Sequence, residues 1–118
     1  MFQRNIYMKL QDWSNNPNHK PLILRGARQV GKTTLVNEFS KEFENYIHLN
    51  LEREVEARIF EQSDSVEEIL QLCCFQKKIT LKEGRTLLFI DEIQNVPKAV
   101  SLLRYFYEDM PQLFVIAA

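Results

Sequence analysis

Near its beginning the chain reads Gly26-Ala27-Arg28-Gln29-Val30-Gly31-Lys32-Thr33, which fits the pattern G-x-x-x-x-G-K-[ST]. The apolar run Pro21-Leu22-Ile23-Leu24 precedes it, and residues 34–39 after it are compatible with a helix. A strand, a loop of this pattern and a helix, in that order, form a phosphate-binding P-loop. A glycine-containing turn before an amphipathic helix would explain each residue singly but would leave the spacing unexplained.

The residue types in this loop suit a polyphosphate. Gly26 and Gly31 permit conformations and close approaches that a Cβ atom would block. The backbone N–H groups of the loop can then turn inward, and the helix that begins near Lys32 adds its own unpaired N–H groups. We therefore predict that the bound nucleotide contacts Gly26, Ala27, Arg28, Gln29, Val30, Gly31, Lys32, Thr33 and Thr34.

Specific roles follow for two of these side chains. Lys32 is expected to reach the β- and γ-phosphates and act in catalysis, and the Thr33 hydroxyl is expected to ligate Mg²⁺. The side chains of Arg28 and Gln29, on an exposed loop, are more often solvated than catalytic.

A second motif is the apolar run Leu87-Leu88-Phe89-Ile90, which ends in Asp91-Glu92. Ligands of parallel sheets bind beyond the carboxyl ends of the strands, so this acidic pair should face the P-loop. Asp91 fits the Walker-B role of holding Mg²⁺, directly or through its water shell, and Glu92 fits a catalytic base that orients and deprotonates water. An apolar strand that ends in Asp-Glu is weak evidence for a functional site by itself, but the P-loop upstream strengthens that interpretation.

Composition sets the class of protein. The chain has 118 residues, enough for one core, and balances 15 basic against 16 acidic side chains, so nucleic-acid binding is possible but unsupported. No apolar run approaches the roughly 20 residues of a membrane span, and the start lacks the apolar segment of a signal peptide. Cys73 and Cys74 are adjacent, which suits neither a disulfide nor a metal site, so we expect a cytoplasmic protein.

Strand and helix signals alternate along the chain. We expect strands over 21–25, 46–51, 86–90 and 113–116, and helices over 2–14, from about 32 to 44, within 52–61, after the capping-box sequence at Ser65, and from Pro97. The predicted core faces are Leu35, Val36, Phe39 and Phe43; Val55, Ile59 and Phe60; Val66, Ile69, Leu70 and Cys73; and Val100, Leu103 and Tyr107. This alternation predicts a three-layer α/β/α P-loop NTPase fold with a mostly parallel sheet.

The motifs narrow the class of nucleotide-binding protein. The chain contains neither the guanine reader Asn-Lys-x-Asp of GTPases nor the ABC signature Leu-Ser-Gly-Gly-Gln. Adjacent Asp-Glu after a long apolar strand is typical of AAA+ and related ATPases.

At this level of detail the sequence resembles a family, the prokaryotic AAA-domain ATPases that usually carry a C-terminal DUF4143 domain. The resemblance rests on Leu22 to Leu35, above all Gly-Ala-Arg-Gln-Val-Gly-Lys-Thr, and continues through Phe89 to Gln94, Pro97, Leu103 to Glu108 and Val115 to Ala118. It covers nearly the whole chain and implies an ATP-binding core whose larger biological task is poorly defined.

The resemblance also implies a truncation after the fourth strand. Residues 1–19 would be an N-terminal helix and loop, and residues 20–118 the nucleotide-binding core. The fifth strand, the γ-phosphate sensor, any arginine finger and the C-terminal domain would lie outside the chain. Such ATPases order their sheet 5-1-4-3-2, so the P-loop strand would form an exposed edge at which another chain could pair.

Other residues have competing interpretations. Gln94 could relay the state of the γ-phosphate, and Trp13 could stack on adenine, although packing against the core is the stronger interpretation. We expect His19 and His48 to be structural, Arg104 to be a surface charge, and the cluster Tyr105-Phe106-Tyr107 to belong to the core rather than to a nucleic-acid platform.

Three functions remain open from the sequence. The first is Mg²⁺-dependent ATP hydrolysis by the intact protein, with weak or absent activity in this chain. The second is a nucleotide-dependent binding switch with negligible turnover, and the third, less favoured, is a small-molecule or nucleotide kinase, for which no lid can be found. The partner and the biological process are not identified by the sequence.

Overall fold

The computed structural model describes residues 2–25 and 31–118. In these ranges four strands form one parallel sheet in the order β1-β4-β3-β2. The strands are β1 (Leu22–Ile23), β2 (Asn45–Asn50), β3 (Thr86–Asp91) and β4 (Phe114–Ala117). Parallel neighbours need crossover connections, and helices supply them here. The predicted parallel α/β sheet is confirmed.

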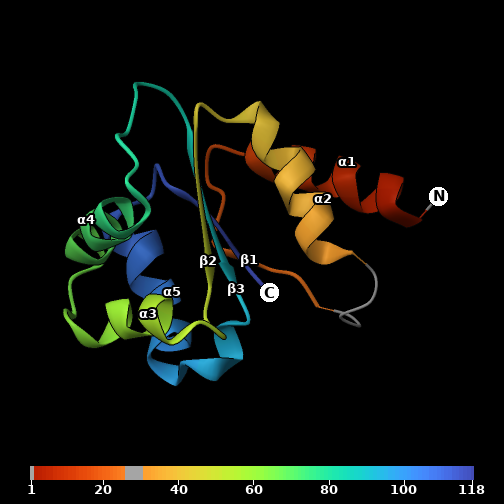
Figure 1. Ribbon diagram of the computed structural model, residues 1–118. Helices are drawn as coiled ribbons and strands as arrows, with labels where there is room; N and C mark the ends of the chain where they lie inside the picture. The colour runs from red at the N-terminus through yellow and green to blue at the C-terminus, as the bar shows by residue number, and fades with distance from the viewer. Residues whose placement is uncertain (1, 26–30) are drawn as a thin grey trace.

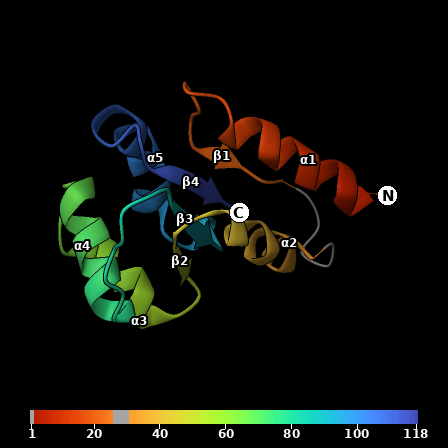
Figure 2. The same ribbon diagram turned by 90° about the horizontal axis from the view of Figure 1, so that it is seen from above.

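Helices cover both faces of the sheet (Figures 1 and 2). One face carries α1 (Phe2–Ser14) and α2 (Lys32–Phe39), and the other carries α3 (Glu54–Ala57), α4 (Val66–Lys77) and α5 (Pro97–Asp109). Leu87 and Phe89 of β3 join the core under α1 and α2, whereas Leu88 and Ile90 join the core under α3, α4 and α5. Because β3 is covered on both faces, its sequence is a continuous apolar run.

β1 lies at an edge of the sheet. Within the described residues it pairs only with β4, with Leu22 opposite Ile116 and Ile23 opposite Ala117. The Leu24 N–H extends this pairing with a 2.8 Å bond to the Ala117 carbonyl. The edge position predicted for the P-loop strand is therefore confirmed.

The helix after the P-loop is shorter than predicted. It ends at Phe39 instead of Glu44, and a 3₁₀ turn over Ser40–Glu42 follows. Phe43 has an extended backbone (φ −119°, ψ 147°) because the chain must enter β2 two residues later. The Phe43 ring is nevertheless buried and meets Phe39 edge-on, so its predicted place in the core is correct although it is not helical.

Two predicted core faces need correction. Val55 is 56% exposed, and its neighbour Glu56 is the buried residue of α3. In α5, Val100 is 44% exposed. The buried face of α5 consists of Ala99, Leu102, Leu103 and Phe106.

The cluster at residues 105–107 divides between the core and the surface, because Phe106 is buried whereas Tyr105 is exposed and Tyr107 half-buried. Consecutive residues of a helix point in different directions, so a run of three aromatic residues cannot share one face. The expectation that all three residues belong to the core is therefore correct only for Phe106.

The segment before β1 is anchored by aromatic packing. The Trp13 Nε1–H donates to the Lys20 carbonyl at 2.6 Å, and the Trp13 ring meets Phe114 edge-on. His19 stacks on the same Phe114 ring at 3.9 Å between centroids. The packing interpretation of Trp13 and the structural interpretation of His19 are confirmed. No helix that the structure describes has the length and apolar character to cross a membrane.

Candidate functional site

Of the predicted phosphate-binding loop, residues 26–31, the structure describes only the last residue, Gly31. The predicted contacts at Gly26, Ala27, Arg28, Gln29 and Val30 lie outside the described residues. Gly31 has φ 73°, in the left-handed region that glycine adopts without a Cβ penalty, and its carbonyl accepts the Leu35 N–H at 2.9 Å. Gly31 therefore ends the loop and starts α2, and the first N–H groups of this helix lack intrahelical acceptors.

Thr33 and Asp91 lie in direct contact. The Thr33 hydroxyl, in the first turn of α2, donates a 2.8 Å hydrogen bond to Asp91 Oδ2 at the carboxyl end of β3. These residues are 58 positions apart in the sequence. The structure therefore brings together the two side chains predicted to hold Mg²⁺, while Lys32 and Thr34 flank Thr33 in the same helical turn.

Glu92 follows in a left-handed backbone conformation, with φ 56° and ψ 43°. Its backbone N–H donates to Asp91 Oδ1 at 3.0 Å, so both oxygens of Asp91 accept hydrogen bonds. The Gln94 Nε2–H donates to Glu92 Oε1 at 2.7 Å. The two carboxylates of the acidic pair thus have different partners: Asp91 faces Thr33, and Glu92 faces Gln94.

The backbone around Glu92 is tied to the end of β4. The Ala118 N–H donates to the Ile90 carbonyl, and the Ile93 N–H donates to the Ala118 carbonyl, each at 3.0 Å. These two bonds span the turn that contains Asp91 and Glu92. Ala118 therefore fixes this turn from the neighbouring strand.

His48, expected to be only structural, lies beside the acidic pair. Its Nε2 is 3.5 Å from Asp91 Oδ2. Burial lowers the pKa of His48 below its ordinary value, while the Asp91 carboxylate acts in the opposite direction. Alternation along β2 places His48 on one face, but only the pairing of β2 with β3 puts that face beside Asp91, so sequence reasoning missed the contact.

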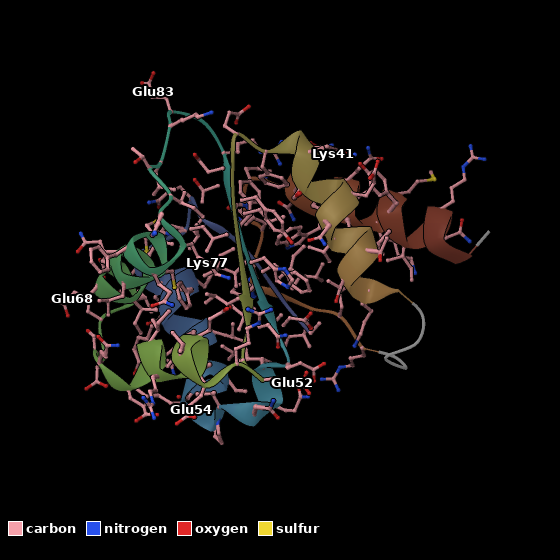
Figure 3. All side chains as sticks on the ribbon, in the orientation of Figure 1. Lys41, Glu52, Glu54, Glu68, Lys77 and Glu83 are labelled. Carbon is pink, nitrogen blue, oxygen red and sulfur yellow. The ribbon has the colours of Figure 1, made fainter. Side chains whose placement is uncertain are left out.

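A small polar cavity of about 190 Å³ adjoins His48 and is lined by His48, Asn50, Arg53, Glu56 and Lys77. Glu56 is 5% exposed, accepts the Asn50 N–H at 2.8 Å, and forms an ion pair with Lys77 Nζ at 3.1 Å. Figure 3 shows Lys77 between α4 and the sheet. A buried carboxylate needs such partners, and they explain why α3 buries Glu56 and exposes Val55.

A larger groove of about 550 Å³ lies between α1 and α2. Its lining includes Tyr7, Met8 and Gln11 of α1 and Thr34 and Leu35 of α2. The Tyr7 hydroxyl and the Gln11 amide both donate to Glu42 Oε2, at 2.6 and 2.9 Å, and these bonds hold α1 against the 3₁₀ turn that follows α2. The groove therefore adjoins the helical turn that carries Thr33.

Two further predictions concern residues away from the site. Arg104 is exposed and its Nε donates to Glu108 Oε2 at 2.8 Å within α5, so it is a surface charge, as predicted. Cys73 is buried in the core and burial raises the pKa of its thiol to about 12. The predicted core position of Cys73 is confirmed.

Comparison with models of protein families gives a match over most of the chain. Residues 18–118 match the sequence profile of a family described as AAA domain. A search of curated proteins gave no match.

Proposed function

Because the chain belongs to the AAA domain family of nucleotide-binding P-loop NTPases, we propose that it binds ATP with Mg²⁺ and that the intact protein hydrolyses ATP. The observation that carries this proposal is the 2.8 Å hydrogen bond from Thr33 to Asp91. It joins the helix that follows the phosphate loop to the strand that ends in two carboxylates. The choice of ATP over GTP as the bound nucleotide rests on the adjacent Asp-Glu pair and on the family.

The residues present fit Mg²⁺. A hydroxyl and a carboxylate are hard oxygen donors of the kind that Mg²⁺ prefers. In such sites Mg²⁺ keeps several waters, and few protein ligands hold it together with the substrate phosphates. When bound, the ion neutralises charge on the β- and γ-phosphates. We assign Thr33 to direct ligation and Asp91 to the ion or its water shell.

The nucleotide-binding core would comprise residues 20–118, with the segment 1–19 attached to it. In this core Lys32, at the first position of α2, would bind the β- and γ-phosphates. The loop Gly26 to Gly31 and Thr34 would contribute backbone N–H groups to the phosphates. Positioning and electrostatic stabilisation supply most of the rate in phosphoryl transfer, so these groups bind and catalyse at once.

Glu92 is the proposed general base. It adjoins Asp91, so its carboxylate is placed to orient an attacking water and accept its proton. The amide of Gln94, which donates to Glu92 Oε1, would hold this carboxylate until the γ-phosphate site is filled. Release of that bond is the step by which Gln94 would relay nucleotide state.

Binding is tested first by equilibrium titration with ATP, with and without Mg²⁺. Wild type should bind, and Lys32→Ala should lose most of the affinity because a charge partner of the phosphates is gone. Lys41→Ala, which removes a solvent-exposed lysine from the turn after α2, is the matched control and should bind as wild type does. Equal binding by wild type and Lys32→Ala would refute the assignment of the loop.

Hydrolysis and the switch function are then separated by single-turnover cleavage of ATP. The Gln94 bond to Glu92 favours the switch in the isolated chain, because a carboxylate held by an amide is a poorer base. Cleavage that Glu92→Gln abolishes supports the enzyme, whereas tight binding without cleavage supports the switch. Transfer of labelled phosphate to an acceptor other than water would instead support the kinase.

The groove between α1 and α2 is the proposed place for the nucleoside. Thr34 lines it and is adjacent to Thr33, and its lining combines apolar Met8 and Leu35 with polar side chains. Trp13 packs on Phe114 and does not line this groove. Met8→Glu should weaken binding of ATP and of adenosine diphosphate alike while leaving binding of inorganic triphosphate unchanged, and an equal loss for triphosphate would refute the placement.

Partners and location are also proposed. The exposed edge at β1 would pair with another strand, either from a C-terminal domain or from a second copy of the chain. Nucleic acid remains unsupported, since the overall charge is −1. The two free cysteines are compatible with the cytoplasmic location proposed from their spacing.

A further inference from the structure

His48 carries a buried nitrogen that the structure leaves without a good partner. Its Nε2 is inaccessible to solvent and has no hydrogen-bond partner of good geometry among the described residues. The nearest acceptor is Asp91 Oδ2, at 3.5 Å. Buried polar atoms are nearly always satisfied in folded proteins, so a buried nitrogen aimed at a carboxylate calls for an explanation.

The imidazole is held in this direction by aromatic neighbours. The Phe89 ring of β3 lies nearly parallel to it, with centroids 4.8 Å apart and planes at 12°. Tyr46, two residues earlier on β2, is also near-parallel, at 6.1 Å. The Tyr46 hydroxyl donates to Asn37 Oδ1 of α2, so the stack is connected to the same helix that carries Thr33.

The strand register brings His48 and Asp91 together. His48 is paired with Phe89 and Asn50 with Asp91, so His48 and Asp91 are diagonal neighbours on adjacent strands. Thr33 meets Asp91 Oδ2 from α2, while His48 faces the same oxygen from β2. Asp91 therefore lies between a residue of the phosphate-binding helix α2 and a residue of β2.

We propose that His48 is a positioning residue for Asp91, whose Nε2–H holds the Oδ2 atom in the orientation that faces Thr33. This inference rests on the proposed function of Thr33 and Asp91 as a Mg²⁺ site. When the Thr33 hydroxyl turns to the metal, Asp91 Oδ2 loses that donor. His48 then supplies the donor to Oδ2, while the Glu92 N–H stays on Oδ1. Partners of this kind behind a metal-binding carboxylate typically change metal affinity about 10- to 100-fold when removed.

Two substitutions separate this role from simple packing. His48→Phe keeps a flat ring for the stack between Phe89 and Tyr46 but has no donor. His48→Gln loses the ring but can place an amide N–H near the position of Nε2. A packing role predicts that Phe is the better replacement, whereas a positioning role predicts that Gln is.

The first experiment measures ATP affinity in EDTA and then as a function of Mg²⁺ concentration, at about pH 8, where an ordinary histidine is neutral. We expect His48→Phe to bind ATP in EDTA as wild type does but to need about tenfold more Mg²⁺ for the same enhancement. His48→Gln should recover most of that difference.

The outcomes are distinct. Two results would overturn the role of His48 and leave the proposed function standing. One is an unchanged Mg²⁺ dependence of ATP affinity in His48→Phe. The other is a loss of ATP affinity in EDTA and in Mg²⁺ alike that His48→Gln does not recover. Absence of ATP binding by wild type refutes the proposed function, and the inference with it.

A second readout needs no nucleotide. The chain has two histidines, so nitrogen-15 spectra of the free protein contain two imidazoles, and His48→Phe assigns them. The neutral His48 ring should carry its proton on Nε2, and Asp91→Asn should shift the His48 Nε2 resonance while leaving the His19 resonances in place. A His48 ring protonated on Nδ1 alone would present a lone pair to the carboxylate and would overturn the inference.

Discussion

At Glu92 a bulky, charged residue occupies backbone angles that glycine adopts more readily. Left-handed conformations cost an ordinary residue roughly 1–2 kcal/mol, because the Cβ atom crowds the following carbonyl. Hydrogen bonds on both sides hold the conformation: the Glu92 N–H donates to Asp91, and the Ile93 N–H donates to Ala118. Strain held in this way next to Asp91, the proposed Mg²⁺ ligand, is expected at a functional site.

Replacing Glu92 with glycine should therefore stabilise the fold and abolish turnover. We expect Glu92→Gly to raise the free energy of unfolding by about 1 kcal/mol, measured by urea denaturation, because the strain of the left-handed backbone is relieved. Lys78→Gly is the matched control: Lys78, the C-cap of α4, also has positive φ (57°) and lies away from the acidic pair.

Lys78→Gly should gain similar stability and leave single-turnover cleavage unchanged. A stability loss in Glu92→Gly alone would mean that contacts of the Glu92 side chain outweigh the backbone strain.

Single residues of the site differ in how far the local sequence could predict their contacts. Asp91 and Thr33 were predicted to meet because each ends or begins a recognisable motif. His48 could not be assigned, because its role depends on the register of β2 against β3, which is a contact between distant segments. Glu56 was missed for a similar reason: its partner Lys77 comes from another helix, and only that pairing makes burial of a carboxylate acceptable.

Among the elements, α4 has the most defined start. Ser65 is its N-cap, and the Ser65 hydroxyl accepts the Glu68 N–H at 3.3 Å. The predicted capping box is modified here, because Ser63, rather than Glu68, accepts the Ser65 N–H at 3.0 Å. The Ser63 hydroxyl in turn donates to the Glu68 carboxylate, so three side chains share the N-terminal groups of the helix.

Ser65→Ala should lower the free energy of unfolding by about 1 kcal/mol, the usual cost of losing a serine N-cap. Ser63→Ala should cost less, and the double substitution should cost less than the sum, because the two hydroxyls act in one network. Urea denaturation of the two single variants and the double variant measures the coupling. Strict additivity would show that Ser63 and Ser65 act independently.

Cys73, on the buried face of α4, should make stability depend on alkaline pH. Its pKa is raised by burial to about 12, above that of an unfolded thiol, so the folded state keeps a proton that the unfolded state releases. Its contribution is fully present below about pH 8.5, the ordinary value for cysteine, and is lost progressively as pH rises toward 12.

Urea denaturation from pH 8 to 10 should therefore show a decline that is shallower in Cys73→Ala, whose overall stability is lower because of the cavity. Cys74→Ala is the comparison: burial raises the pKa of the Cys74 thiol too, but this residue is only half-buried, so its removal should flatten the decline less. An equal pH slope in wild type and Cys73→Ala would contradict the assignment.

Element boundaries followed from the sequence where one signal dominated. Pro97 at the start of α5 and Ser65 before α4 mark starts that the structure confirms. The rotation of α5 was harder to predict, because Val100 and Leu103 have helical spacing but Leu102 and Phe106 compete for the core. The packing of α5 against β4 and α4 decides between these faces, and it buries Ala99, Leu102, Leu103 and Phe106.

At the scale of the whole molecule, the arrangement of the helices and the sheet in layers was the feature that the sequence predicted best. A buried strand such as β3 and alternating strands and helices leave few topologies, because crossovers between parallel strands are right-handed. The order β1-β4-β3-β2, however, came from family resemblance rather than from periodicity. It is this order that leaves β1 with a single neighbour among the described strands.

We expect the chain to associate reversibly through β1, because an unpaired strand edge invites pairing with another chain. Ile23, 47% exposed on this strand, is the natural residue to change, and Ile23→Lys should shift sedimentation profiles toward the monomer. Phe75→Lys is the control, since Phe75 is 84% exposed but lies on α4. Dissociation by Phe75→Lys and not by Ile23→Lys would place the contact on α4 instead.

The bonds of Ala118 give β4 a second task besides completing the sheet. Both the residue before Asp91 and the residue after Glu92 are tethered to one amino acid on a neighbouring strand. Any binding event that displaces Ala118 would re-aim Glu92, the proposed general base, without touching the nucleotide. The proposed hydrolysis would then respond to a partner that binds the end of β4, far from the nucleotide.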